Sequence, residues 1–414
     1  MKLKSLLKKS IISAVISVIA AGASFITNII VARMYGIEDY AYFSYVISLT
    51  SITSMISTLG LNQYLLLKLP GKNPAIKSSI QKKACNTFYV SNVVISIVLL
   101  CFLLLNGSSI VEGLFICTIS ILSSSFIFRQ GVYFSEERII SSQLIDRVIR
   151  ALFLIILLVL FKLLSINEST IIVSLSIILS YLFASVIYLF LIRDVNVFYL
   201  KQPGLMEASE VKSSLMLCAV VIATTLLSNF DIIFLGFVKN NIDLSVYASS
   251  QKISLMGAIF LLSITNVVTP SLVKSKDKDL KSSLIHATSI GFLSSLLFFI
   301  FVLIFGEFVL SIFGSEFKTG YNTLVILALS QLVSAYFGQS LTMMKVKGDI
   351  KRLSIFILIA LLFKALLISD FYQMWGINGV AISTLISVFV WNYLCFRYLN
   401  KNYGLDTSLR NIFR

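Results

Sequence analysis

The sequence contains little charge and few residues with metal-binding or redox chemistry. Charged residues make up 13% of its 414 residues, and histidine occurs once. A soluble domain of this length needs a charged surface to stay in solution, so the composition excludes an ordinary soluble protein. The five cysteines lie in or at the edge of apolar segments and form no CxxC pair, which indicates small buried side chains rather than metal ligands or disulfides.

Signatures of soluble enzymes are also missing. The sequence has no phosphate-binding GxxxxGKS/T motif and no GxGxxG motif, which excludes ATP-driven transport by this chain and a dinucleotide fingerprint. All predicted loops are short, so no catalytic or sensory domain fits between the apolar segments. We therefore expect a protein that is not an enzyme, needs no cofactor and acts within the bilayer.

Hydrophobic residues dominate what is present: they make up 57% of the chain, and the mean hydropathy is +0.94. They fall in runs of about 20 residues, the length that crosses ~30 Å of hydrocarbon in a helix. We predict an all-α polytopic membrane protein with about twelve transmembrane helices. The predicted spans are residues 11–35, 40–61, 84–105, 110–128, 149–164, 170–192, 214–238, 247–269, 285–305, 321–344, 353–369 and 377–398.

Basic residues fix the expected orientation. Most of the 34 lysine and arginine residues fall at the two ends of the chain and in alternate predicted loops. Since positive charge stays on the cytoplasmic side, both termini are predicted to be cytoplasmic, in a bacterial inner membrane. The formal charge of +15 and the pI near 9.5 then reflect topology and contact with anionic lipid headgroups, not nucleic acid.

The linker 193–213, which contains Pro203 and Gly204, divides the predicted spans evenly. We therefore predict two six-helix lobes, residues 1–200 and 201–414, that form a V around a central cavity. Two lobes of the same orientation are typical of transporters that bind their substrate between repeats.

Four charged residues lie inside or at the ends of predicted spans, on the outer side: Arg33, Asp231, Lys252 and Lys364. An intramembrane charge is costly unless it is paired or faces water, so each is a candidate functional residue. One interpretation is a structural ion pair of Asp231 with Lys252 or Arg33. The other is a cationic cavity for an anionic substrate, lined by Arg33, Lys252 and Lys364, with Asp231 as gate latch or ion site.

Several segments resemble a known family, in the expected order along nearly the whole chain. They are SFITNIIVARMYGIEDYAYFSYVISL (24–49), SNFDIIFLGFVKNNIDLSVYASSQKIS (228–254), VVTPSL (267–272), IFGSEFKTGYNTLVILALSQ (312–331) and WGINGVAISTLIS (375–387). The chain is similar to the polysaccharide transporters of the MOP superfamily (multidrug/oligosaccharidyl-lipid/polysaccharide), in particular the O-antigen flippases of the Wzx type. Ala41 stands where the family usually has glycine.

This resemblance implies a flippase that carries an undecaprenyl-pyrophosphate-linked oligosaccharide, an O-antigen or capsule repeat unit, across the inner membrane by alternating access. It implies a proton or sodium gradient as the energy source, with Asp231 as the residue that senses the ion. The implied partners are the lipid-linked oligosaccharide, membrane lipids and other glycan-assembly proteins.

Three other functions stay open at this point. A MATE-type drug/cation antiporter would favour an anionic or aromatic cavity, whereas three of the four intramembrane charges here are basic. A membrane glycan polymerase would need a large outer loop with catalytic arginines. A flippase for the peptidoglycan precursor usually has more helices than this sequence shows.

The predicted topology has a direct test. Reporter fusions at Arg414 and within residues 193–213 should be active only as cytoplasmic reporters, because both sites lie on the positively charged side. A periplasmic reporter that is active at either site would contradict the orientation and, with it, the placement of the four intramembrane charges.

Overall fold

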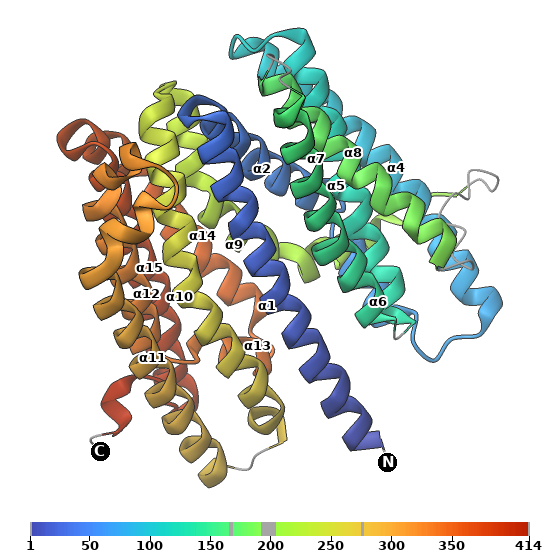
Figure 1. Ribbon diagram of the computed structural model, residues 1–414. Coiled ribbons are helices and arrows are strands. Elements are labelled where there is room, and N and C mark those ends of the chain that lie inside the picture. The colour runs from blue at the N-terminus through green and yellow to red at the C-terminus, as the bar shows by residue number, and fades with distance from the viewer. Residues whose placement is uncertain (1, 137, 165–168, 192–203, 275–276, 413–414) are drawn as a thin grey trace. The chain divides into compact units, whose positions relative to one another are not determined.

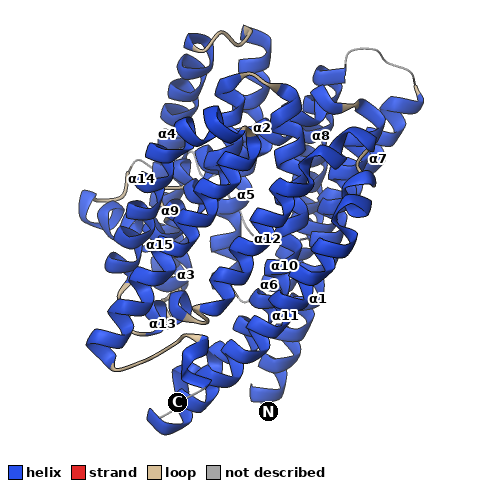
Figure 2. Ribbon diagram, turned by 90° about the vertical axis from the view of Figure 1, so that its left-hand side faces the viewer, coloured by secondary structure: helices blue, strands red, loops and turns tan. Residues whose placement is uncertain are grey.

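The computed structural model describes residues 2–136, 138–164, 169–191, 204–274 and 277–412. Within these residues the chain forms helices joined by loops and turns, without a strand (Figure 2). The predicted all-α class is therefore confirmed.

Every predicted span falls on helices of the structure. The helices are α1 (Lys2–Tyr35), α2 (Ile37–Ser57), α3 (Leu61–Lys68), α4 (Pro74–Leu105), α5 (Ile110–Ser135), α6 (Ile139–Gln143), α7 (Arg150–Leu163), α8 (Ser169–Leu191), α9 (Ala208–Val238), α10 (Asn241–Lys274), α11 (Asp277–Ser311), α12 (Tyr321–Tyr336), α13 (Ser340–Val346), α14 (Ile350–Trp375) and α15 (Ile377–Tyr403). A π-helical turn, η1 (Leu144–Ile149), joins α6 to α7, and two short 3-10 helices, η2 (Ser315–Gly320) and η3 (Leu409–Ile412), complete the set.

Length and composition make the chain a multi-pass membrane protein. Eight described helices are long and apolar enough to cross a membrane, and the number rises to ten if each of two bent helix pairs forms one span. The predicted span 149–164 corresponds to α7, which has only 14 residues but continues from η1 and α6. The predicted span 247–269 lies within α10.

Two predicted spans, 40–61 and 321–344, are bent rather than straight. The chain bends by 49° between α2 and α3 and by 47° between α12 and α13. Gly60 (φ 75°) and Gly338 (φ 62°) occupy these breaks. A positive φ cannot continue a right-handed helix, and glycine adopts it without steric cost. Leu59, beside Gly60, also has a positive φ of 47°. The apolar runs predict the spans, but these few backbone positions divide them.

The chain divides into two compact units, Met1–Thr225 and Leu226–Arg414, called here the N-terminal and C-terminal units. Their boundary lies inside α9. The predicted boundary between lobes, at 200 and 201, lies outside the described residues, and the predicted lobe limits stay a prediction.

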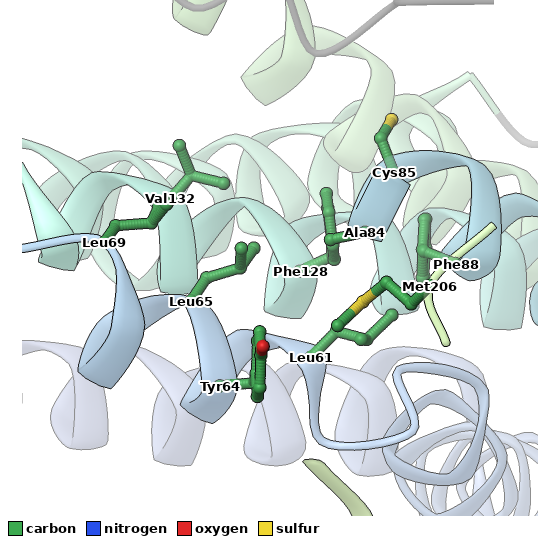
Figure 3. Packing of buried hydrophobic residues seen from close by; sticks show 10 residues of the cluster. All are labelled: Leu61, Tyr64, Leu65, Leu69, Ala84, Cys85, Phe88, Phe128, Val132 and Met206. Atoms are coloured by element: carbon green, nitrogen blue, oxygen red, sulfur yellow. The ribbon is translucent and has the colours of Figure 1, made fainter. Parts of the chain in front are cut away.

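In the N-terminal unit, the short helix α3 packs into a buried apolar cluster with α4 and α5. Figure 3 shows the side chains of this cluster close together: Leu61, Tyr64, Leu65, Leu69, Ala84, Cys85, Phe88, Phe128, Val132 and Met206. The rings of Phe88 and Phe128 stack with centroids 4.6 Å apart. Burial of this apolar and aromatic area stabilises the packing of α3 against α4 and α5.

In the C-terminal unit, α10, α11, α12 and α15 lie side by side, and α14 packs on α15 (Figure 1). The chain after α15 folds back onto this unit. Leu405, Thr407 and Ser408 are buried, and Thr288 on α11 donates a hydrogen bond of 3.1 Å to the Thr407 carbonyl. A side chain at Gly338 would overlap that carbonyl, so the tail packs directly against the break between α12 and α13.

The contact between α3 and α5 gives a stability prediction. A Cβ atom at Gly131 on α5 would overlap the backbone of Asn62, whereas a Cβ at Gly22 on α1 has no atom within 4 Å. Gly131→Ala should therefore lower the thermal unfolding temperature of the purified protein, because α3 must move away from α5. Gly22→Ala, the matched control, should leave it unchanged or raise it, since alanine favours a helix. Equal unfolding temperatures for both variants would contradict the packing of α3.

Candidate functional site

Asp231 on α9 and Lys364 on α14 form an ion pair within the C-terminal unit. The Lys364 Nζ lies 2.8 Å from Asp231 Oδ1 and donates a hydrogen bond of 2.8 Å to Oδ2. It also donates to the Leu227 carbonyl at 3.0 Å, one turn earlier on α9. Asp231 exposes 0% and Lys364 1% of its surface, so each charge is compensated by protein groups rather than by solvent.

Two hydroxyl groups complete the surroundings of the Asp231 carboxylate. Tyr247 on α10 donates a hydrogen bond of 2.6 Å to Oδ2, and Thr384 on α15 donates one of 2.9 Å to the same oxygen. Oδ2 thus accepts from three donors, whereas Oδ1 faces the Lys364 ammonium and accepts no hydrogen bond from a described residue. The network joins α9, α10, α14 and α15, and Asp231, Tyr247, Lys364 and Thr384 are called the Asp231 network below.

Lys364 lies farther from its helix end than the sequence predicts. The predicted span ends at 369, but α14 continues to Trp375, which places Lys364 about eleven residues, or ~16 Å, from the end. Polar contacts hold this extension in place. Tyr372 near the end of α14 donates a hydrogen bond of 2.6 Å to Asp243 in the first turn of α10. The apolar run therefore underestimates the helix, because paired polar residues continue it.

Lys252 and Arg33 do not belong to the Asp231 network. Lys252 on α10 is half-buried and makes no hydrogen bond or ion pair among the described residues. Arg33 is exposed in the last turn of α1, in the N-terminal unit. The predicted pairing of Asp231 with Lys252 or Arg33 is corrected to Lys364. The predicted roles of these residues in substrate binding and gating stay predictions.

The Asp231 network can act as a latch between helices. The cation of the network is the side chain of Lys364 on α14 and cannot diffuse away. A proton or sodium ion would therefore contact the Asp231 carboxylate freely only after Lys364 withdraws. Separation of the pair would free an ammonium group and a carboxylate together.

No group of three or more His, Cys, Asp or Glu side chains suited to a metal ion occurs in the part of the chain that the structure describes.

A second buried carboxylate, Asp146 in η1, is absent from the sequence predictions. It exposes 5% of its surface. Tyr188 on α8 donates a hydrogen bond of 2.6 Å to its Oδ1, while Gln130 on α5 (2.9 Å) and Ser142 on α6 (3.4 Å) donate to its Oδ2. The polar residues of this stretch suggest a loop, although the apolar residues in LIDRVI (144–149) are spaced as in a buried helix. That spacing is the signal that could have identified Asp146.

Comparison with known proteins comes first from a family model. A model described as "Polysaccharide biosynthesis protein" matches residues 6–276, which is well over half of the chain. The match includes most of the N-terminal unit, Asp146, Asp231 and Lys252. No curated protein sequence matches the chain.

Solved structures with the same fold are membrane transporters and flippases. An inward-facing multidrug resistance MATE family transporter of the MOP superfamily has a TM-score of 0.71 at 14% identity, over 95% of this chain and 98% of that one. The lipid II flippase MurJ in an inward closed conformation has a TM-score of 0.70 at 16% identity, over 97% of this chain and 91% of that one. The MATE multidrug transporter DinF-BH has a TM-score of 0.69 at 16% identity, over 98% of this chain and 96% of that one. At these identities the similarity shows the fold alone.

The Asp231–Lys364 pair predicts a specific pattern of stabilities. Lys364→Met strands a buried carboxylate and should cost about 3–5 kcal/mol of unfolding free energy, whereas Asp231→Asn combined with Lys364→Met should recover most of it. Lys252→Met, the matched control, should cost little, because Lys252 has no ion-pair partner among the described residues. Thermal unfolding of the purified variants measures all three. A double variant as unstable as Lys364→Met would show that the pair does not account for the loss.

Proposed function

Because the chain belongs to the polysaccharide biosynthesis protein family, we propose that it is a flippase for an undecaprenyl-pyrophosphate-linked oligosaccharide, an O-antigen or capsule repeat unit. It moves the repeat unit from the cytoplasmic to the periplasmic leaflet of a bacterial inner membrane and makes or breaks no covalent bond. The observation that carries this proposal is the family match over residues 6–276 on a fold shared with transporters and with the lipid II flippase MurJ.

A half-buried cation of the C-terminal unit suits an anionic headgroup. Lys252 has no ion-pair partner among the described residues, and in this proposal its ammonium binds the anionic headgroup. A pyrophosphate offers several oxygens to such a group, and lysine binds phosphate as a compact point charge. The glycan and pyrophosphate would move through protein while the polyprenyl chain stays in lipid.

The Asp231 network supplies a switch for alternating access. In the paired state Lys364 is neutralised by Asp231 and is closed to solvent. If α9 and α14 separate, Lys364 becomes a further cation for the pyrophosphate, and the Asp231 network serves as the gate latch. Arg33, exposed at the end of α1 in the N-terminal unit, stays a separate candidate cation for the headgroup. The paired and open states differ in their affinity for an anion, as a transport cycle requires.

A MATE-type drug/cation antiporter is the second candidate, because MATE structures share this fold over nearly their full length. The charge of the site distinguishes the two. A Lys252 without an ion-pair partner among the described residues attracts a pyrophosphate and repels a cationic drug. Cells that express the protein should therefore export surface glycan without expelling a cationic dye such as rhodamine, and dye efflux without glycan export would favour the antiporter.

Removal of the Lys252 charge tests the proposed function. Lys252→Ala should lower surface glycan about tenfold, which corresponds to about 1.4 kcal/mol of lost interaction with the headgroup. Lys252→Arg, which keeps the charge, should have a milder effect. Lys318→Ala, at an exposed lysine of η2, is the matched control and should export like the parent.

Membrane abundance of each variant must be measured beside export, because the lysine stem also packs against its neighbours. Normal export by Lys252→Ala at normal abundance would rule out Lys252 as a headgroup ligand.

A further inference from the structure

We infer that Asp146 is the carboxylate at which this transporter binds a coupling proton. The assignment rests on the proposed transport function. It identifies the residue that would bind and release the coupling proton. It replaces Asp231 in the role that the sequence suggests, because in this structure the Asp231 carboxylate is paired with Lys364.

The buried carboxylates of the described residues differ in how their charge is compensated. Asp231 is paired with an ammonium group. Asp39, also buried, lies in the first turn of α2, where the backbone N–H groups of the helix end favour a negative charge. Asp146 has no cation within ion-pair distance among the described residues, and its oxygens accept only from tyrosine, glutamine and serine. A proton can therefore neutralise Asp146 without breaking an ion pair with a described residue, whereas at Asp231 it would have to break one.

The hydrogen bonds around Asp146 can rearrange to accept a proton. The Tyr188 hydroxyl lies 2.6 Å from Asp146 Oδ1 and 3.2 Å from the Ser142 carbonyl, so it has two acceptors for one hydrogen. When the carboxylate is ionised, Tyr188 donates to Oδ1. When Oδ1 gains a proton, that proton is donated to the Tyr188 oxygen, and Tyr188 donates its own hydrogen to the Ser142 carbonyl. One proton is gained, every donor keeps an acceptor, and no heavy atom has to move.

The local backbone is also unusual. Asp146 lies in η1, a π-helical turn of six residues between α6 and α7. Such turns are rare and occur frequently at functional sites, because they interrupt the regular ladder of backbone hydrogen bonds. A turn of this kind can change its hydrogen bonds more easily than an uninterrupted α-helix.

The charged groups nearby are basic. On α5, the Arg129 guanidinium lies over the rings of Phe126 (5.6 Å) and Tyr188 (5.9 Å). On α7, Arg150 lies over the ring of Tyr181 (4.4 Å) and donates a hydrogen bond of 3.0 Å to the Asp146 carbonyl. Loss of the Asp146 charge makes the potential around these two guanidinium groups more positive, so protonation favours an anion beside them.

Few other titratable groups among the described side chains lie around η1. Tyr133 stacks on Tyr188, Arg147 is exposed on η1 itself, and Glu136 and Arg138 pair with each other at 4.0 Å beyond the end of α5. The described side chains of α1, which packs on η1, contact this region through the Ser13–Gln143 hydrogen bond of 2.7 Å. Among the described side chains, Arg129 and Arg150 are therefore the charged groups that lie nearest to the Asp146 network.

Infrared difference spectroscopy tests this assignment without a substrate. The purified protein in lipid nanodiscs is taken between acidic and neutral pH, and the carboxylic C=O band of a buried, hydrogen-bonded acid is followed. The band should be present in the parent and absent in Asp146→Asn. It should persist in Asp243→Asn, the matched control, whose carboxylate also accepts from a tyrosine but is only half-buried.

Tyr188→Phe gives a second, independent reading. It keeps the carboxyl group and removes its shortest hydrogen bond, so the band should remain and shift to higher frequency. If Asp146→Asn does not fold, this shift decides the assignment. A parent band that persists unchanged in Asp146→Asn, or that does not shift in Tyr188→Phe, would overturn it.

Export of surface glycan at acidic and neutral external pH completes the experiment. Asp146→Asn should lose the pH dependence of export that the parent shows, and an unchanged dependence would overturn the coupling role. If the parent exports no glycan but the infrared band is still lost in Asp146→Asn, the proposed flippase function is rejected. The assignment of Asp146 as a proton-binding site is then retained. The two failures are therefore distinguishable.

Discussion

A charge that is removed from water must find an opposite charge or enough hydrogen bonds, and in the C-terminal unit this requirement is met at one point. The Asp231 carboxylate takes its cation from α14 and its hydroxyl donors from α10 and α15. None of these helices can slide along α9 without exposing an uncompensated charge to an apolar environment, which costs several kcal/mol. Apolar packing among the helices tolerates small shifts, whereas the ion pair does not. It therefore fixes the register of the helices around it.

The N-terminal unit compensates a buried carboxylate in a different way. Asp146 is held by neutral donors, and Arg129 and Arg150 lie over aromatic rings nearby. A carboxylate held in this way keeps its partners whether or not it is charged. Asp231 can lose its cation only if a helix moves. Asp146 can gain a proton when only hydrogen atoms change position. The two carboxylates lie in different units of the chain.

The sequence predicts the helices well because lipid imposes a simple rule: an apolar run of sufficient length must be a helix. It predicts three of the charges that matter in the C-terminal unit for the same reason, since Asp231, Lys252 and Lys364 interrupt such runs. The prediction from sequence fails where a few residues determine the backbone conformation or the end of a helix. The positive φ of Gly60 and Gly338 bends two spans, and paired polar residues lengthen α14 beyond its apolar run. The partner of Asp231 could not be chosen from helix order alone, because helices that are distant in sequence meet in the fold. Asp146 escapes prediction because the arginines around it give the segment the composition of a loop.

The buried tail of the chain has a consequence for biosynthesis. Thr407 and Ser408 follow α11 and α12 at a long distance in the chain, yet they are as buried as the core of the C-terminal unit, and the Thr407 carbonyl lies against the break between α12 and α13. Domains generally fold as they leave the ribosome, N-terminal segments first. Here α11 and α12 are inserted long before the segment that covers their ends has been made. The packing of α11 and α12 is therefore complete only after the segment that contains Thr407 has been made, and until then the Thr407 carbonyl does not cover Thr288 and Gly338.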